Sequence, residues 1–414
     1  MKLSTNIIKI KYKDGFILYN TLTKEIIYMK NTIISEDNSI LGGLECYSYL
    51  KEHWFLSDSM DDDISMYKLF RDHIKYSDEI VSFIIHTNYT CNLKCEYCYQ
   101  NQLESNKKMS IEIVYDVIKF INEILDYTEP KTIDLCFIGG EPLTEINTIS
   151  KICNNMALHN DVNVIKSIIT NGTLLNDKIV EILEQQKFGT VQITMDGDRA
   201  NHNKLRISKD GRGTYDLILK NLIKYNKRIP ITLNINLNSS NYEKIEFLLE
   251  DIKKNNICVD IVFSEIFDHC NSLYNKKIKY GSNIWLETHS KAMEYGCKFN
   301  PFYKNTDFLC DLYRKNSFII GPEGDLFKCL SGVGLDEYKI GNINSYFTPS
   351  TEIKQSQFIE YNRLKTDCYS CQYKVVCGVN CHFKHKNRDF ICYKQDIETN
   401  DIPLIIKQFE KDGL

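Results

Sequence analysis

The sequence lacks an apolar run of the roughly 20 residues that a membrane-spanning helix needs, so nothing in it predicts a membrane protein. It also lacks a long basic block, and with a net charge of −4 it offers a nucleic-acid substrate no electrostatic support. Lys9 and Lys11 interrupt its first apolar stretch, so we expect no signal peptide and a cytoplasmic location. Its 414 residues suffice for two or three domains.

Cysteine, in contrast, is abundant, with 16 in the chain. Disulfides are disfavoured in a reducing compartment, so clustered cysteines predict metal or redox chemistry. Cys91, Cys95 and Cys98 stand in one loop between a β-branched segment and a helical pattern that begins near Met109. Three thiolates can hold three corners of a four-iron cluster and leave one iron open for a small molecule. A zinc loop is the alternative.

Six β-branched runs alternate with amphipathic helical patterns between residues 81 and 265. Repeated βα units predict an α/β fold with a parallel sheet, which right-handed crossovers curl toward a partial (β/α)6 TIM-like barrel; a doubly wound sheet is the alternative. The expected strands are Val81–Thr87, Thr132–Ile138, Val164–Thr170, Thr190–Met195, Ile231–Leu237 and Val259–Ser264. The cysteine loop and three polar turns follow the first four strands, at the edge where α/β barrels carry their chemistry. These turns are Gly139–Pro142, Thr170–Gly172 and Asp196–Gly197.

Residues 1–80 differ from this pattern. Phe16–Tyr28 predicts a hairpin, and helices are expected near Leu44–His53 and Ile64–Tyr76, separated by the acidic run Asp61–Asp63. Together they indicate a small N-terminal αβ domain of winged-helix type.

The last hundred residues hold a second set of cysteines. A hairpin with its turn at Pro322–Gly324 is expected to place Cys329 at the end of the returning strand. The spacing C-x13-G-x4-C from Cys310 to Cys329 precedes C-x2-C-x5-C-x3-C-x10-C, which runs from Cys368 to Cys392. Two zinc sites are the alternative to iron–sulfur clusters here.

The CxxxCxYC spacing at 91–98 resembles the signature of the radical S-adenosylmethionine (SAM) enzymes, and the tail, with all seven cysteines in order, resembles their SPASM extension. In that family the open iron chelates SAM and cleaves it to a 5′-deoxyadenosyl radical. The resemblance implies a radical SAM barrel at 81–270, a linker at 271–306, a SPASM domain at 307–400 and a tail at 401–414. Residues 1–80 would then be a precursor-peptide recognition element or a structural lid.

The resemblance also implies SAM and three [4Fe-4S] clusters as cofactors. The SAM cluster would use Cys91, Cys95 and Cys98, and the outer auxiliary cluster Cys368, Cys371, Cys377 and Cys392. The inner auxiliary cluster would use Cys310, Cys329 and Cys381, with Cys297 as a tentative fourth ligand. Without Cys297, its open iron could bind a substrate thiolate.

By the same resemblance, SAM would lie among residues at the strand ends. Gly139 and Gly140 would let the backbone approach its methionine part, and Glu141 would accept from its ammonium group. Arg206 would pair with its carboxylate. The adenosine contacts would be Tyr97 against the adenine, with Asn171, Thr194 and Asp196 near the ribose.

These assignments predict a peptide maturase that forms an oxidative crosslink, most simply a cysteine thioether, of sactipeptide or ranthipeptide type. Its partners would be a cysteine-rich ribosomal precursor with a leader and a flavodoxin- or ferredoxin-type reductant. The alternatives are an anaerobic sulfatase-maturing enzyme that makes formylglycine, and a non-catalytic iron–sulfur or zinc scaffold. A catalytic base is not assignable, although Asp307 and Asp311 are candidates.

Overall fold

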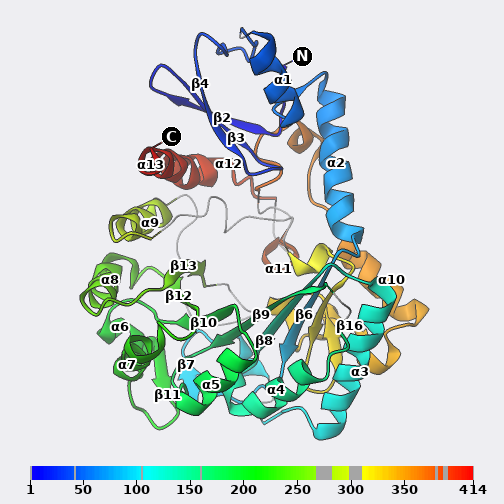
Figure 1. The fold of residues 1–414 in the computed structure, drawn as a ribbon, viewed down its shortest axis with the longest axis vertical. Coiled ribbons are helices and arrows are strands. Elements are labelled where there is room, and N and C mark those ends of the chain that lie inside the picture. Colours follow the sequence, from blue (N-terminus) through cyan, green and yellow to red (C-terminus); the bar gives the residue numbers. More distant parts are fainter. Residues whose placement is uncertain are drawn as a thin grey trace.

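The structure is a computed structural model that describes residues 2–41, 43–103, 106–158, 161–266, 282–297, 310–377, 381–385 and 390–413. A curved sheet with flanking helices forms the larger part, and a smaller sheet with helices lies at the other end of the long axis (Figure 1). The smaller part contains both chain ends, because the C-terminal helix packs beside the N-terminal strands. None of the described helices has the length and apolar character that crossing a bilayer requires.

Six parallel strands make up the barrel part of the sheet. They lie in the same order in space as in the sequence, which confirms a partial barrel and excludes the doubly wound alternative, whose strand order would reverse. Every expected strand is present within one residue at each end. The strands are β6 (Ile80–His86), β8 (Thr132–Ile138), β9 (Asn163–Thr170), β10 (Thr190–Thr194), β12 (Ile231–Leu237) and β13 (Asp260–Glu265).

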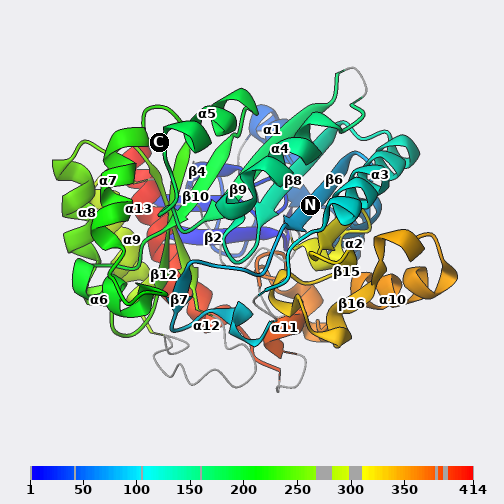
Figure 2. The same cartoon turned by 90° about the horizontal axis from the view of Figure 1, so that it is seen from below.

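The connecting helices lie along the outer side of this sheet (Figures 1 and 2). The first of them begins where the sequence predicts, because the Ser110 hydroxyl accepts from the backbone N–H of Ile113 at 3.3 Å and so caps it. Its apolar face is buried against the strands. The helices are α3 (Ile111–Thr128), α4 (Ile146–Asn154), α5 (Asp177–Gln185), α6 (Arg199–Leu205), α7 (Tyr215–Tyr225) and α8 (Ile245–Lys254).

The predicted hairpin and one further strand extend the sheet beyond β6, an attachment to the barrel that the sequence did not predict. Strand β14 (Ser317–Ile320) pairs in parallel with β6, and the antiparallel strands β15 (Asp325–Phe327) and β16 (Lys339–Asn342) follow. The hairpin of β14 and β15 turns at the expected residues, with Gly324 at a φ of +78°. The barrel and the cysteine-rich region therefore share one nine-stranded sheet.

The N-terminal part contains a three-stranded antiparallel sheet of β2 (Ile7–Tyr12), β3 (Gly15–Asn20) and β4 (Ile26–Lys30). A second, two-stranded pair joins β1 (Lys2–Leu3) to β5 (Leu56–Ser57), and the helices are α1 (Leu44–Glu52) and α2 (Met60–Tyr76). The acidic run Asp61–Asp63 does not separate two helices as expected, because it forms the first turn of α2. Negative side chains are favourable there, next to the positive end of the helix dipole, and Ser59 caps the turn.

The expected linker and tail contain further helices. Helix α9 (Ile284–Glu294) lies within the linker range, and residues 401–414 include α13 (Ile402–Asp412) rather than an unstructured tail. The cysteine-rich region also has α10 (Pro349–Ile359) and the short helices α11 (His382–His385) and α12 (Lys394–Asp396). On α13, Phe409 packs against Tyr12 and Tyr28 of the N-terminal sheet, with ring centroids 5.6 and 6.1 Å away.

The join between barrel and cysteine-rich region depends on Phe318 of β14. Its ring is fully buried and lies 5.5 Å from that of Phe83, 5.4 Å from Phe120 and 5.2 Å from Tyr346.

Replacing Phe318 by Ala should lower the free energy of unfolding by about 3–5 kcal/mol, because the cavity cannot fully collapse. Anaerobic denaturant titration measures this. The matched control is Phe347→Ala, which removes a ring that is 56% exposed and should change stability by less than about 1 kcal/mol. Equal effects of the two substitutions would contradict the packing role.

Candidate active site

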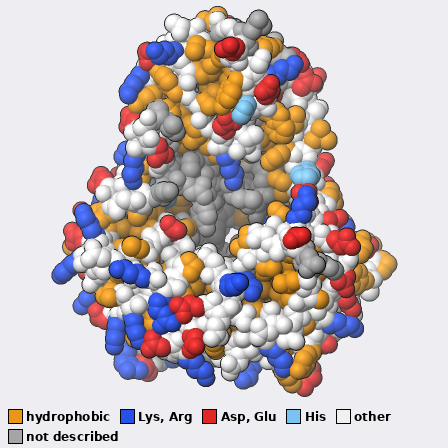
Figure 3. Space-filling view, in the orientation of Figure 1, with side chains coloured by type: hydrophobic (Ala, Val, Ile, Leu, Met, Phe, Trp, Pro, Cys, Tyr) orange, Lys and Arg blue, Asp and Glu red, His pale blue; other side chains and the backbone are white. Residues whose placement is uncertain are grey.

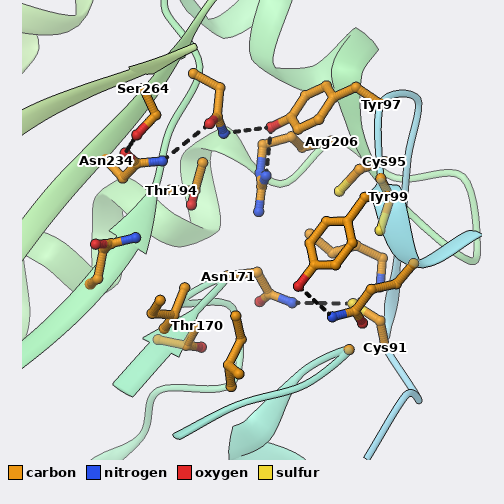
Figure 4. Close-up of a pocket in the computed structure, with 18 of the residues that line it drawn as sticks. Cys91, Cys95, Tyr97, Tyr99, Thr170, Asn171, Thr194, Arg206, Asn234 and Ser264 are labelled. Atoms are coloured by element: carbon orange, nitrogen blue, oxygen red, sulfur yellow. Dashed lines mark hydrogen bonds between the residues drawn. The ribbon is translucent and has the colours of Figure 1, made fainter. Parts of the chain in front are cut away.

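A pocket of about 330 Å³ opens at the carboxyl ends of the barrel strands (Figure 4). Its wall combines the cysteine loop with inward-facing residues of β8, β9, β10, β12 and β13. Six of the eight predicted SAM contacts line it, and Glu141 and Asp196 lie outside the lining. The lining contacts are Tyr97, Gly139, Gly140, Asn171, Thr194 and Arg206, together with the three loop cysteines. Asp196 lies behind the wall and is fully buried.

The cysteine loop is attached to the barrel by a short antiparallel pair of strands. Strand β7 (Leu93–Cys95) pairs with β11 (Arg206–Ser208), and Cys95 stands directly opposite Arg206 in this register. The backbone N–H of Glu96 continues the ladder by donating to the carbonyl of Leu205 at 2.9 Å. The predicted cluster loop and the predicted SAM arginine, more than a hundred residues apart in sequence, therefore have a fixed relative position.

Asn171, at the end of β9, holds the other end of this loop. Its side-chain amide donates to Asn92 Oδ1 at 2.8 Å and lies 3.8 Å from Cys91 Sγ. Cys91 Sγ also accepts from the backbone N–H of Leu93 at 3.3 Å. Hydrogen bonds to a thiolate stabilise its charge. The Asn171 side-chain NH2 group thus donates to the cysteine loop, while its predicted contact with the ribose stays a prediction.

The two glycines after β8 serve a purpose that the sequence reasoning missed. A Cβ on Gly139 would lie 2.7 Å from the carbonyl oxygen of Asn88, and one on Gly140 would lie 2.3 Å from that of Thr90. The loop after β6 passes at that distance, and Gly140 N–H donates to Asn88 O at 3.1 Å. The glycines therefore admit the start of the cysteine loop, in addition to bordering the pocket.

Glu141 is also bound within the protein. Its fully buried carboxylate accepts from Thr170 Oγ1 at 2.6 Å, from the backbone N–H of Asn171 at 2.7 Å and from that of Leu143 at 3.0 Å. Burial raises its pKa, and these hydrogen bonds oppose the rise. The carboxylate thus joins the ends of β8 and β9, and its predicted contact with the SAM ammonium stays a prediction.

Tyr97 directs its hydroxyl toward a buried polar group. This oxygen accepts from Arg206 Nη1 at 2.7 Å and from Asn236 Nδ2 at 3.0 Å, and it donates to a carboxylate oxygen of Asp196. Asp196 also lies 3.9 Å from Arg206 Nη1. Burial raises the pKa of Asp196, while Arg206, Tyr97 and Asn236 oppose that shift. The expected stacking of Tyr97 on adenine stays a prediction, whereas its polar contacts are explicit in the structure.

The residues present fit SAM and its cluster on two observations. Arg206 lines the pocket, and within the described ranges its buried Nε has no hydrogen-bond partner, so the guanidinium retains a donor for a carboxylate. Cys91, Cys95 and Cys98 also line this one pocket, although burial raises the pKa of the Cys91 thiol, and that of Cys95 to about 12. Buried thiols become thiolates when a strong Lewis acid such as iron replaces the proton.

The auxiliary cysteines fall into two groups. Cys310 and Cys329 are half-buried, and burial raises the pKa of both thiols. Negative charge at Cys329 and Cys381 raises the pKa of Cys310 further, and negative charge at Cys381 raises that of Cys329. Cys368 is half-buried, and burial, together with negative charge at Cys371 and Cys392, raises its pKa. Among the described residues no three His, Cys, Asp or Glu groups converge on one point as the ligands of a single ion do. A cubane instead takes each thiolate at a different iron.

Three further residues were predicted to take part near the inner group: Cys297, Asp307 and Asp311. The charged neighbours of Cys297 are Lys411 and Asp260, so the described geometry does not join it to Cys310, and its role as a ligand stays a prediction. Asp311 accepts from Ser317 Oγ at 2.6 Å beside the inner group, and Asp307 lies outside the described residues. Neither is selected as a base.

The sequence reasoning missed the amide-rich part of the wall. Gln192 of β10, Asn234 and Asn236 of β12 and Ser264 of β13 all line the pocket. A signal was present, because β12 reads Ile-Thr-Leu-Asn-Ile-Asn-Leu, with polar residues at every second position of a buried strand. In a barrel strand that alternation marks the side that faces the interior.

Fold and pocket together define an α/β partial-barrel enzyme that binds its cofactors at the carboxyl edge of the sheet. Residues 85–252 match the Radical SAM superfamily. The barrel part of the chain is therefore a radical SAM domain, and the chain is an enzyme rather than a non-catalytic scaffold.

Similar proteins agree with this class. The cysteine-type anaerobic sulfatase-maturating enzyme of Clostridium novyi (strain NT) is 26% identical over 338 residues, which cover 72% of this chain and 87% of that protein. The structure of native anSMEcpe with bound AdoMet and Kp18Cys peptide superposes with a TM-score of 0.62 at 19% identity, covering 80% and 99% of the two chains. Streptococcus suis SuiB bound to precursor peptide SuiA superposes with a TM-score of 0.54 at 16% identity, covering 95% and 99%.

The contacts of Glu141 predict a specific effect of Glu141→Gln. The substitution replaces one acceptor oxygen by an N–H group that must face other donors, so the free energy of unfolding should fall by about 1–3 kcal/mol. Anaerobic denaturant titration of the variant against wild type measures this. Gln185→Glu, on the exposed end of α5, is the matched control and should have little effect. Unchanged stability in Glu141→Gln would show that the carboxylate does not hold the two strand ends together.

Proposed function

We propose that this enzyme oxidises a ribosomally made precursor peptide and joins a cysteine sulfur of that peptide to one of its carbon atoms as a thioether. The cofactors would supply a 5′-deoxyadenosyl radical for hydrogen abstraction and an auxiliary-cluster acceptor for the surplus electron. The chain's own residues would bind SAM in the pocket, hold the cysteine loop and guide the peptide. The observation that carries the proposal is the attachment of an N-terminal αβ part to a SPASM-type barrel.

The relatives support a peptide as substrate. The SuiB structure was determined with a precursor peptide, and its fold covers 95% of this chain, against 80% for anSMEcpe bound to the Kp18Cys peptide. The part of this chain that SuiB covers beyond the share covered by anSMEcpe is about as long as a small domain. A fold that covers 95% of this chain and was solved with a precursor peptide bound favours maturation of such a peptide over action on a folded protein.

Formylglycine formation is the second candidate. It is favoured by the sulfatase-maturating relatives, one of which matches 72% of this chain at 26% identity. Both reactions remove hydrogen from a peptide carbon and both are net oxidations. They differ in the fate of sulfur, because a thioether retains it and conversion of cysteine to formylglycine removes it.

The assigned cysteines would hold three clusters. Cys91, Cys95 and Cys98 would bind the SAM cluster, because they surround the pocket that Arg206 borders. The inner group would lie between that pocket and the surface, and the outer group, with Cys392 exposed, would exchange electrons with a flavodoxin- or ferredoxin-type protein. Charged side chains of both signs are interspersed on the face in Figure 3, so no large patch of one sign marks a partner there.

The reaction can be tested with anaerobically reconstituted enzyme, dithionite, SAM and the peptide encoded by a short cysteine-rich reading frame beside the gene. We expect 5′-deoxyadenosine and a peptide product that has lost two hydrogens per crosslink and kept its sulfur. Cys91→Ala should abolish both, because two thiolates cannot hold the open-iron cluster. The surface variant Cys258→Ala is the matched control. Loss of sulfur from the product would favour formylglycine formation, and absence of deoxyadenosine from intact holoenzyme would contradict radical chemistry altogether.

The N-terminal sheet offers a place for the leader. Within the described residues β4 pairs only with β3, and its residues 26–28 are half-buried, so an extended peptide could add a strand at this edge. We expect the same precursor peptide to slow hydrogen exchange of the β4 amides at 26–30 more than at α8, which serves as the internal reference. A core peptide without its leader should not do so. Unchanged exchange of β4 at saturating precursor would favour the structural-lid interpretation.

A further inference from the structure

A continuous chain of side-chain hydrogen bonds runs along the pocket wall to Tyr97 (Figure 4). Ser264 Oγ donates to Asn234 Oδ1 at 2.6 Å, and Asn234 Nδ2 donates to Asn236 Oδ1 at 3.3 Å. Asn236 Nδ2 then donates to the Tyr97 hydroxyl at 3.0 Å. The chain connects the last barrel strand with the cysteine loop, across a wall to which the sequence assigned no role.

The Tyr97 hydroxyl is the point where this chain meets the guanidinium. A phenol has one proton to donate and two lone pairs to accept with. Here the proton goes to Asp196, and the lone pairs accept from Asn236 Nδ2 and from Arg206 Nη1. Because Asp196 takes the proton, the hydroxyl is oriented as an acceptor for the guanidinium.

Asn236 contributes to this arrangement twice. Its side chain donates to the Tyr97 hydroxyl, and its backbone N–H donates to Asp196 Oδ1 at 3.0 Å. The second carboxylate oxygen of Asp196 is the one that receives the Tyr97 proton. One residue of β12 therefore fixes both groups that Nη1 of Arg206 faces.

This arrangement engages one nitrogen of the guanidinium, Nη1, and leaves Nε available for a further hydrogen bond. Nη1 is engaged by Tyr97 and Asp196, while Nε is buried without a partner among the described residues. A guanidinium binds a carboxylate best through two parallel N–H groups, and Nε belongs to such an edge. Because Arg206 lines the pocket, holding Nη1 in place also fixes the position of that edge beside the pocket.

We propose that Asn236 is a positioning residue for SAM: through the Tyr97 hydroxyl and Asp196 it orients Arg206 to receive the SAM carboxylate. This inference rests on the proposed contact between Arg206 and SAM. Asn236 need not touch the carboxylate itself. Its loss should therefore weaken recognition of that one group of the cofactor while leaving the rest of the binding unchanged.

The test uses unreduced holoenzyme, in which ligand binding is measured by anaerobic equilibrium dialysis with SAM and with decarboxylated SAM. For Asn236→Leu we expect SAM to bind about tenfold more weakly, as after the loss of one well-oriented charged contact, with decarboxylated SAM unchanged. Tyr97→Phe, which keeps the ring and removes the hydroxyl, should do the same. Because the readout is binding, it does not depend on turnover or on the peptide.

The controls separate positioning from general damage. Iron content and thermal unfolding of each variant are matched to wild type, and Tyr97→Phe carries the test if Asn236→Leu fails to fold. Gln192→Leu changes an amide of the same wall and should alter binding of both ligands equally. The double variant should bind SAM no more weakly than Tyr97→Phe alone, because both substitutions remove one shared contact.

Three outcomes would overturn the proposal. Equal weakening of both ligands in Asn236→Leu would mean that the pocket as a whole has changed. Additive effects in the double variant would mean that Asn236 does not act through the Tyr97 hydroxyl. Wild-type enzyme that binds the two ligands equally would remove the carboxylate contact of Arg206 itself, a failure of the underlying site assignment that the first two outcomes do not imply.

Discussion

The structure around the pocket depends on the burial of one positive charge. The Arg206 side chain is only 10% exposed and Asp196 is fully buried, and an isolated charge in such surroundings would be expensive. The nearby carboxylate, the Tyr97 hydroxyl and the β7–β11 pairing compensate that cost. Burial alone would lower the pKa of Arg206, but its neighbours Cys95, Tyr97 and Asp196 hold it well above its ordinary value. Loss of any one of these interactions would leave the buried guanidinium less well compensated, so each of them contributes to the stability of the site.

A second buried cation connects the cysteine-rich region with the N-terminal part. Lys374, in the loop between Cys371 and Cys377, is 1% exposed and donates to the carbonyl and hydroxyl oxygens of Thr5 at 3.2 and 3.1 Å. Asp63 of α2 stabilises its charge and accepts from the backbone N–H of Thr5 at 2.7 Å. Burial nevertheless lowers the pKa of Lys374 to about 8. The loop of the outer cysteine group is therefore packed into the N-terminal part, rather than joined to it by a linker.

Much of this architecture could be predicted from sequence because its signals are local. The six barrel strands are continuous β-branched runs, and Ser110 marks the start of α3 at the residue where it begins. The role of Gly140 could not be read in this way, since its close contact is the backbone of Thr90, fifty residues away. Tyr97 shows the same limit: the motif identified the aromatic residue, but only the fold brings its hydroxyl to Arg206 and Asn236. Spacing reveals which residues belong to a site, and the tertiary contacts decide what each side chain touches.

The shared sheet has a consequence for where chemistry can occur. Strand β14 pairs with β6 from Ser317 opposite Ser82 to Ile320 opposite Ile85, and parallel neighbours in a sheet lie about 4.8 Å apart. Cys310 precedes β14 and Cys329 follows its hairpin partner, while the loop of Cys91 follows β6. The distance between the loop of Cys91 and the pair Cys310 and Cys329 is therefore set by the hydrogen bonds between β6 and β14. It does not depend on a flexible linker. A substrate that must meet a radical on one side and an electron acceptor on the other would require such a constant distance, and one continuous sheet provides it.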